Sequence, residues 1–576
     1  MNYRLFEPNV DSFIIYEGQL KEGAYGYNHD VSVEWFDGQF YAVWNAHPSS
    51  VIEGDSGQVN VLSTSPDFRE WSHPVPYLHD KAYVENPVYN PDIVAWQPNL
   101  LNMGEELWCT WCYCHPVSKS RSCRDSGTYL SVLRKGAKRW VTAKIVDRLE
   151  IDGQAAVGFP TQNPFRCSSG RVLAPMVFVN SDRQQHRDET DEKKNSMWDV
   201  CAYTDDDGKT WHFSNPMSRV DDYFGQWEPF FYEQADGTLR GIMRNFSGGD
   251  VMPSTQWLMT TTGAGAEKGS PLQFDPDLQY AGIETGRARP QVFRLPGGRY
   301  ALLMNDNYNL RGSRMNLSVF FSRTGRNDFV AGIPFSPHEL YSTYPQGVEH
   351  DGKLYIAYTA TENGHRQWTI RGAVIDAPEP DVRYLWPRSK RIEEWKWNPE
   401  KRVREREVSI CHVDPVRLQI VDGRTCVVVG NRASCGVEMD AVDWDKDGEV
   451  SIALDFRIDA LQEIGNLVLL SFGDINPVRI VMPSNRSGAL YAWGRSGWVR
   501  VADCGVGEWH GLKVRIASGH FDVQVDETEA HRVEAPQVAP NPRLYLGDGY
   551  ECDYIPSNLG SEFIIDIDSL ALSVLP

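Results

Sequence analysis

Apolar strands recur along the first two thirds of the chain, and the same turn precedes each of them. The repeated pattern is a glycine, one or two polar residues and then an apolar strand, as in DGQFYAVWN at Gly38 and DGKLYIAYTA at Gly352. Further copies begin at Gly104, Gly170, Gly237 and Gly298, so neighbouring glycines lie 54 to 67 residues apart. Each interval is long enough for one four-stranded antiparallel sheet with its loops. The pattern predicts an all-β fold that contains a six-bladed β-propeller.

Beyond residue 395 this repeat is lost, but apolar and polar positions still alternate. Segments such as SIALDFRI and LKVRIASGHFDVQVDE have the two-residue period of half-buried strands. We therefore expect two domains, a catalytic propeller over residues 1–395 and a jelly-roll β-sandwich over residues 396–576. The strand and turn order of the second domain resembles the concanavalin-like and laminin-G-like sandwiches that are often fused to sugar-cleaving enzymes. We expect this sandwich to pack on the propeller, or to form a homo-oligomer, rather than to bind sugar.

A second repeated phrase follows several copies of the first. Its best copy is Thr204-Asp205-Asp206-Asp207-Gly208-Lys209-Thr210-Trp211. This phrase resembles the Asp-box hairpin of sialidases and other propellers, in which the Asp ties the turn and the Trp packs between strands. The resemblance implies a structural role for Asp206.

Composition and charge narrow the functional class. The 576 residues include 57 Lys and Arg against 78 Asp and Glu, and the net charge of -21 disfavours binding to nucleic acid or to an anionic membrane. No run of about 18 apolar residues occurs, and the start, MNYRLFEPNV, lacks the basic and apolar pattern of a signal peptide. We expect a soluble, cytoplasmic protein, or a secreted one if a leader has been removed from it.

The cysteines favour reduced thiols over a disulfide framework. Cys109, Cys112 and Cys114 lie in the strand-like stretch LWCTWCYCH, and no second pair of zinc ligands stands at a suitable spacing. We expect buried cysteines on a strand, and we expect neither a metal ion nor a cofactor.

The innermost strand of each propeller blade lines the central axis, where ligands bind. Polar groups that converge there predict a ligand site, because a purely structural axis would be filled with apolar side chains. Trp96 and Trp227 lie beside two of these positions and are candidates for stacking on a sugar. Counting back seven to nine residues from each repeat glycine reaches His29, Gln97, Gln162, Glu228, Arg289 and Tyr344.

One phrase of the fourth repeat resembles a known family. Glu228-Pro229-Phe230-Phe231-Tyr232-Glu233, followed after a turn by Arg244-Asn245, is similar to the sialidase phrase in which a catalytic Glu precedes a substrate-binding Arg. Arg289 and Tyr344 then stand where sialidases keep a carboxylate-binding Arg and a nucleophilic Tyr. The resemblance covers roughly residues 10–376. It implies a glycoside hydrolase that is exo-acting on a terminal acidic sugar, or on a sugar linked to one, in an oligosaccharide or polysaccharide.

The chemistry of such a sugar explains why these residue types occur together. A carboxylate on the anomeric carbon repels a carboxylate nucleophile, whereas a neutral Tyr344 can approach it and be deprotonated by Glu228. The guanidinium groups of Arg244 and Arg289 can each donate two parallel hydrogen bonds to a carboxylate. The loop EGDSGQ offers Asp55 as the general acid, with Glu53 as its substitute, and sialidases carry their acid at this position.

The first blade departs from the sialidase pattern and leaves alternatives open. Tyr27-Asn28-His29-Asp30 stands where sialidases have a Phe/Tyr-Arg-Ile-Pro phrase. His29 and His47 are instead similar to the paired histidines of propeller lyases that cleave rhamnose-glucuronate and ulvan linkages. In that hypothesis a His removes the proton beside a uronate carboxylate whose charge an Arg neutralises. A structural role for both histidines, a noncatalytic sugar-binding propeller and a protein-interaction platform are the remaining alternatives.

Overall fold

The protein is built almost entirely from β-strands. The computed structural model describes residues 3–88, 94–114, 126–146, 148–181, 196–220, 226–245, 257–284, 288–306, 314, 316–326, 328–337, 340–362, 367–388, 394–398, 403–407, 416–430, 434–439, 449–459, 467–472, 478–482, 488–495, 497–517, 519–534, 543–547 and 562–575. Among these residues the only helical element is a single 3-10 turn, η4 (Pro296–Gly298). None of the helical structure described is long and apolar enough to cross a membrane.

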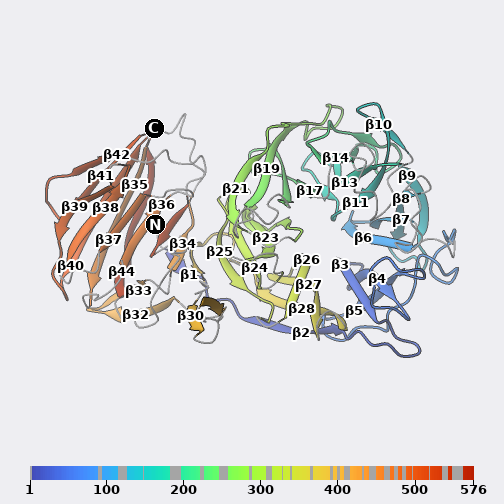
Figure 1. The fold of residues 1–576 in the computed structure, drawn as a ribbon, viewed down its shortest axis with the longest axis horizontal. Helices are drawn as coiled ribbons and strands as arrows, with labels where there is room; N and C mark the ends of the chain where they lie inside the picture. Colours follow the sequence, from blue (N-terminus) through green and yellow to red (C-terminus); the bar gives the residue numbers. More distant parts are fainter. Residues whose placement is uncertain are drawn as a thin grey trace.

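The sheets of the first part of the chain are arranged like propeller blades around a common centre (Figure 1). Four of them follow one another along the chain: β3 (Tyr27–Phe36), β4 (Gln39–His47) and β5 (Val59–Ser65); β6 (Val94–Asn102), β7 (Glu106–Cys114), β8 (Gly127–Arg134) and β9 (Val141–Val146); β10 (Leu149–Ile151), β11 (Gln154–Pro160), β12 (Phe165–Arg166), β13 (Val172–Asn180), β14 (Met197–Thr204), β15 (His212–Phe213) and β16 (Ser218–Val220); β17 (Gln226–Glu233), β18 (Leu239–Asn245), β19 (Trp257–Ala264), β20 (Gln273–Phe274) and β21 (Gln279–Glu284).

Another sheet joins the two ends of this ring. It combines β2 (Val10–Tyr16) with β28 (Gln367–Asp376), β27 (Lys353–Glu362) and β26 (Tyr341–His350). The antiparallel pairing of β2 with β28 brings residues near the start of the chain against residues more than 350 positions later. The ring is therefore held closed by backbone hydrogen bonds between distant segments.

Between β21 and β26 lies an antiparallel run that also connects to the C-terminal part. The run consists of β22 (Gln291–Arg294), β23 (Tyr300–Asn305), β24 (Leu317–Ser322) and β25 (Val330–Pro334). Because β25 pairs in parallel with β29 (Arg383–Arg388), these strands belong to a 12-stranded sheet. That sheet continues through β34 (Ser434–Val437), β43 (Leu544–Leu546), β36 (Leu467–Phe472), β37 (Val478–Met482), β38 (Ala489–Gly494) and β39 (Gly497–Asp503), and β1 (Tyr3–Leu5) pairs with β29.

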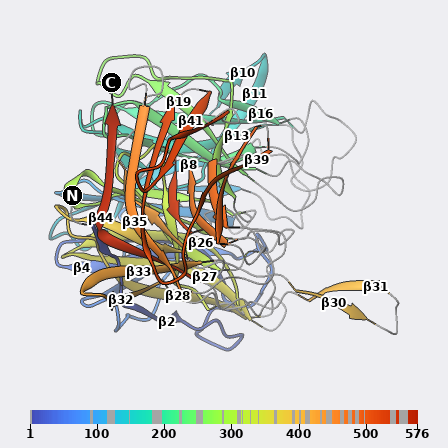
Figure 2. The ribbon, with the colours of Figure 1, turned by 90° about the vertical axis from the view of Figure 1, so that its left-hand side faces the viewer.

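A second C-terminal sheet faces this one across a large apolar core. Figure 2 shows its long strands side by side. In β35 buried positions alternate with partly exposed ones, which is the period that the sequence predicts. Apolar residues of both sheets, together with Tyr3 and Leu5 of β1, form one buried cluster. The strands, in sheet order, are β32 (Arg417–Val421), β33 (Arg424–Gly430), β44 (Glu562–Leu575), β35 (Glu449–Ile458), β40 (Trp509–Ala517), β41 (His520–Val525) and β42 (His531–Glu534).

A two-stranded hairpin of β30 (Glu394–Asn398) and β31 (Val403–Glu407) forms a sheet of its own. It projects away from the other sheets (Figure 2).

The repeat glycines adopt the backbone that the sequence pattern requires. All six have positive φ, from 73° at Gly352 to 93° at Gly104. Glycine enters this region without the steric cost that a Cβ imposes, so it suits the tight turn between an inner strand and its neighbour. The predicted turns are confirmed at each of the six positions.

The hairpin Thr204–Trp211 is tied by one carboxylate. Asp206 accepts hydrogen bonds from Thr204 Oγ1 at 2.9 Å and from the backbone N–H of Thr210 at 2.9 Å, and Trp211 Nε1 donates to the carbonyl of Gly208. The bonds from Thr210 lower the pKa of Asp206 to about 2. These partners of the Asp206 carboxylate all lie within the turn itself.

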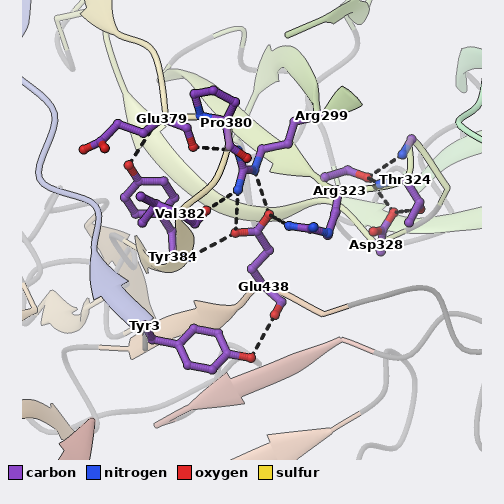
Figure 3. Close-up of polar contacts among 12 residues, drawn as sticks. Tyr3, Arg299, Arg323, Thr324, Asp328, Glu379, Pro380, Val382, Tyr384 and Glu438 are labelled. Atoms are coloured by element: carbon purple, nitrogen blue, oxygen red, sulfur yellow. Dashed lines mark hydrogen bonds and ion pairs between the residues drawn. The ribbon is translucent and has the colours of Figure 1, made fainter. Parts of the chain in front are cut away.

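The C-terminal part is fixed to the ring of sheets by a buried ion pair (Figure 3). Arg299, just before β23, donates to Glu438, just after β34, with Nε and Oε1 2.7 Å apart. The same guanidinium donates to the carbonyl of Glu379, and Glu438 accepts from the N–H of Tyr384 at 2.9 Å. Both charged side chains are almost fully buried, so each depends on the other for charge compensation.

Candidate active site

The innermost strands of four sheets carry the same irregularity. In β3, β6, β17 and β26 the pairing with the next strand shifts by one residue. The first residue of each bulge has positive φ, namely 55° at Asp30, 49° at Gln97, 56° at Glu228 and 52° at Tyr344. A β-bulge of this kind re-aims a side chain, and a non-glycine residue in this region costs about 1 kcal/mol or more. The fold therefore accepts local strain at three positions that the sequence predicts to be functional, Gln97, Glu228 and Tyr344, whereas in β3 the strained residue is Asp30, next to the predicted His29.

Two of these bulge residues meet at one arginine. Arg244 of β18 donates from Nη1 to the hydroxyl of Tyr344 at 2.8 Å, and the same nitrogen lies 2.9 Å from Oε2 of Glu228. All three side chains are buried. A phenol, a carboxylate and a guanidinium thus contact one another where three separate strands converge.

Two further arginines lie over the ring of Tyr344. The guanidinium carbon of Arg289 is 4.0 Å from the ring centroid, and that of Arg314 is 4.8 Å from it. Burial raises the pKa of Tyr344 above its ordinary value, while Arg244 and Arg314 oppose this rise by favouring the phenolate. Arg314 lies between β23 and β24 and is not among the residues that the sequence pattern predicts.

Arg289 is engaged by a carboxylate of the protein itself. It forms an ion pair with Asp30 and donates to the carbonyl of Thr161. The other oxygen of Asp30 accepts from Asn45 Nδ2 at 2.9 Å. The predicted role of Arg289 was to bind the carboxylate of a substrate, and the structure gives its guanidinium an internal carboxylate instead.

His29 lies against the Tyr344 ring. The two rings stack with centroids 4.8 Å apart, and His29 Nδ1 is 3.1 Å from the hydroxyl of Thr359. Burial and the nearby charges of Arg289 and Arg314 hold the pKa of His29 well below its ordinary value. The imidazole is therefore neutral at physiological pH.

The loop between β4 and β5 brings Glu53 to this cluster. The residue is exposed, but desolvation of its carboxyl, together with Asp30, raises the pKa of Glu53 to about 7, against the opposing effect of Arg314. Asp55 instead accepts from the N–H of Ser56 within the loop. His47, at the end of β4, also uses both ring nitrogens within this loop.

The family model described as a BNR repeat-like domain matches residues 38–356, which is more than half of the chain. The chain belongs to the BNR repeat-like family. Its fold is that of the sialidase-like propellers.

Solved sialidase structures share this fold over almost the whole length of both chains. The Trypanosoma rangeli sialidase in complex with 2,3-difluorosialic acid, described as a covalent intermediate, is 12% identical with a TM-score of 0.53, and the match covers 98% of this chain and 96% of that chain. The same sialidase with sialic acid is 12% identical with a TM-score of 0.52, covering 99% and 96%. At this identity the likeness concerns the fold alone. No curated protein has a significantly similar sequence.

The four remaining predicted residues of this BNR repeat-like chain differ in their burial and in their hydrogen bonds. Gln162 is buried and links strands, because Nε2 donates to the carbonyl of Pro290 at 2.7 Å and Oε1 accepts from Gln346 at 3.1 Å. The backbone N–H of Gln97 donates to Asn45. Trp96 is half-buried in β6. Trp227 lies in β17, and its side chain is outside the described part.

One set of donors in the described chain has the composition of a metal site. Ligand atoms of His29, Asp30 and Glu53 lie within 4.8 Å of one another. However, Asp30 is already paired with Arg289, and Arg314 and Arg244 add further positive charge nearby. This donor set does not fit a resident cation. The three cysteines that suggested zinc, Cys109, Cys112 and Cys114, are buried in β7, and His115 lies outside the described residues.

A further sequence signal marks the bulges. Proline follows the bulge residue in Gln97-Pro98, Glu228-Pro229 and Tyr344-Pro345, and the same dipeptide occurs at Arg289-Pro290 before β22. Proline has no N–H to contribute to a strand ladder, so it is tolerated where the ladder is interrupted. A proline after the counted residue thus occurs in four of the six repeats, and in three of these it marks the bulge.

Proposed function

We propose that this protein is a glycoside hydrolase that removes a terminal acidic sugar, or a sugar linked to one, from an oligosaccharide or polysaccharide. The observation that carries the proposal is the contact of Arg244 with both the Tyr344 hydroxyl and the Glu228 carboxylate. Two more guanidinium groups lie over the same phenol ring in a chain of net charge -21. Such a local excess of positive charge favours an anionic guest.

In this proposal Tyr344 is the nucleophile. Glu228 accepts the phenolic proton, and the phenolate oxygen forms a bond to the anomeric carbon. Arg244 stabilises the negative charge on that oxygen as it develops. Because the phenol is neutral before the reaction, it can approach a carbon that carries a carboxylate without charge repulsion.

Glu53 is the proposed general acid. With a pKa of about 7, it is protonated at neutral pH in a substantial fraction of molecules and can give its proton to the leaving oxygen as the glycosidic bond breaks. The resulting carboxylate then takes a proton from water, whose oxygen attacks the anomeric carbon and releases the sugar from Tyr344. Glu228 returns its proton to the Tyr344 phenolate as that bond breaks, and the enzyme regains its starting protonation state.

The acidic group of the substrate is proposed to bind Arg244 and Arg314. Arg289 contributes its charge to Tyr344 while Asp30 holds its guanidinium in place. The site therefore differs from a cluster of three arginines that all face the substrate. Trp96, Trp227, Gln97 and Gln162 are proposed to complete the substrate-binding region or its support.

For the architecture, we propose that β22–β25 act as one further blade, which gives six in all. The catalytic propeller then spans residues 1–395, and residues 396–576 form a β-sandwich. The hairpin Thr204–Trp211 is proposed to be an Asp-box. The facing C-terminal sheets with their shared core support this division.

The test is an assay of the purified protein on sialylated and on glucuronate-containing oligosaccharides, with product analysis. Hydrolysis releases a free acidic sugar without ultraviolet absorbance, and Tyr344→Phe should abolish it. Tyr355→Phe is the matched control, because Tyr355 lies on β27 of the same sheet but outside the cluster. Full turnover by Tyr344→Phe would refute the nucleophile.

A lyase is the second candidate, and one observation favours it. The neutral ring of His29 stacks on Tyr344 beside arginines that could neutralise a uronate carboxylate. In that case His29 would remove the proton beside the carboxylate, and the product would be an unsaturated uronate that absorbs ultraviolet light. His29→Ala would then be the inactivating change, and wild-type protein would generate the absorbing product.

A further inference from the structure

The loop that carries Glu53 closes around a single buried imidazole. His47 Nδ1 accepts the backbone N–H groups of Ser49 and Ser50 at 3.1 and 3.0 Å. On the other side of the ring, Nε2 lies 2.9 Å from the carbonyl oxygen of Ser56. The ring therefore bonds the loop both before and after Glu53.

These contacts define the tautomer of His47. A nitrogen that accepts two N–H groups carries no proton, so the proton is on Nε2 and is donated to Ser56. His47 is 3% exposed, so the ring itself is shielded from water. This tautomer leaves neither nitrogen available to act as a base on a substrate.

The surrounding residues hold the same loop in place. The N–H of Gly54, next to Glu53, donates to Gln58 Oε1 at 2.8 Å, and Gln58 Nε2 donates to the carbonyl of Ala95 at 2.7 Å. A Cβ added at Gly57 would lie 3.4 Å from His47 Nε2, so the backbone passes close to the imidazole. Glu53 thus sits on a short segment that is anchored on both sides.

We propose that His47 is a positioning residue, which acts on catalysis by holding the Glu53 carboxyl at the leaving oxygen. This role rests on the proposed hydrolase function and assigns His47 to the support of the general acid. Removal of the ring would release the backbone groups of Ser49, Ser50 and Ser56 together. The free loop would then place the carboxyl correctly in only a small fraction of molecules.

Leaving-group dependence tests this role. The substrates are a methyl and a dinitrophenyl glycoside of the acidic sugar that the wild-type protein hydrolyses. Departure of dinitrophenolate needs no proton, so only the methyl glycoside depends on the acid. We expect His47→Ala and Glu53→Gln to lower kcat/KM, which reports the step that forms the bond to Tyr344, by about 100-fold or more on the methyl glycoside and by less than about 5-fold on the dinitrophenyl glycoside. His47→Asn, which can restore an acceptor near Nδ1, should recover part of the loss.

The matched control is His79→Ala, which removes a largely buried histidine whose Nδ1 contacts the carbonyl of Val88 in a different loop. It should show no leaving-group dependence. An equal loss on both glycosides, or no loss, in His47→Ala would overturn the positioning role.

Hydrogen–deuterium exchange separates this proposal from the hydrolase proposal. In His47→Ala the amides of residues 49–58 should exchange at least about 10-fold faster, while those of β3 and β26 keep their protection. Unchanged exchange in the loop would overturn the positioning role whatever the activity. If exchange rises but the wild-type protein hydrolyses no acidic glycoside, the loop support stands, and the catalytic role of both Glu53 and His47 is refuted.

Discussion

At the scale of single residues, the proposed acid and the proposed nucleophile lie in different electrostatic environments. The Glu53 carboxyl has a pKa of about 7 because of desolvation and the neighbouring carboxylate of Asp30. The Tyr344 phenol is buried beside arginines that favour its ionised form. In hydrolases, the acid and the nucleophile typically lie in surroundings that shift their pKa values by different causes.

The pKa of Glu53 predicts the alkaline limb of the pH profile. Only the protonated carboxyl can donate, so activity on a methyl glycoside should fall as the pH rises through about 7. In Glu53→Gln this limb should disappear, and the activity should be lower than that of the wild type by about 100-fold or more. Asp55→Asn is the control and should keep the wild-type profile. Loss of the limb in Asp55→Asn instead would transfer the acid role to Asp55.

Arg314 provides a second test at this scale. If it binds the acidic group of the substrate, Arg314→Ala should lower kcat/KM about 10- to 100-fold, as expected for a hydrogen bond to a charged group. The effect should vanish on an analogue whose carboxylate is replaced by an amide. Arg326→Ala, which breaks an exposed pair with Asp236, should leave kcat/KM unchanged. Equal losses on the charged and neutral substrates would contradict the binding role.

At the scale of elements, the bulges convert ordinary strands into carriers of functional groups. Asp199 of β14 lies near one of them, Glu228, and its buried carboxyl accepts a hydrogen bond from the hydroxyl of Ser218 at 2.6 Å. Burial raises the pKa of Asp199 well above its ordinary value. A buried carboxyl of the neighbouring sheet thus lies close to Glu228, the strained residue of β17.

The position of Asp199 predicts a difference between two substitutions. Asp199→Asn keeps an acceptor oxygen and should remain within about 1 kcal/mol of wild-type stability. Asp199→Ala leaves the Ser218 hydroxyl without its acceptor next to Glu228 and should cost about 1 to 3 kcal/mol, with a lower kcat. Urea unfolding and steady-state kinetics of both variants provide the measurement. Identical behaviour of the two would show that the bulge does not need this carboxyl.

Sequence patterns predicted the strands and turns better than the partners of each side chain. The repeat glycines were informative because a tight turn with positive φ has few solutions other than glycine. Glu228 and Tyr344 were predicted because each stands at a fixed place in its repeat, and Arg244 because of the resemblance to the sialidase phrase; the structure brings these three together. The pairing of Arg289 with Asp30 joins residues 259 positions apart, and no local pattern encodes such a contact. Arg314 lies outside the repeated phrase and was missed for the same reason.

At the scale of the whole molecule, the C-terminal part is joined to the ring by strand pairing and by the Arg299–Glu438 pair (Figure 3). Removing one partner of a buried pair leaves an uncompensated charge. Glu438→Ala should therefore lower the free energy of unfolding by about 3 to 5 kcal/mol.

Thermal or urea unfolding measures this loss, and Glu449→Ala is the control. Glu449 pairs with Arg515 at the surface, where a pair contributes about 0 to 1 kcal/mol. A Glu438→Ala variant as stable as this control would show that the C-terminal part is only loosely attached. Removal of residues beyond 395 should lower stability before it affects sugar binding, because Arg299 would lose its carboxylate and β29 would lose its pairing with β34.

The pairing of β1 and β2 with β29 and β28 determines when the protein can finish folding during its synthesis. Residues 3–16 leave the ribosome early, yet their partners in residues 367–388 follow roughly 20 to 70 seconds later at typical rates of translation. During that interval the nascent chain exposes two strand edges that have no partner. Ring closure is therefore a late event, and the cell must protect these edges from other chains until it occurs.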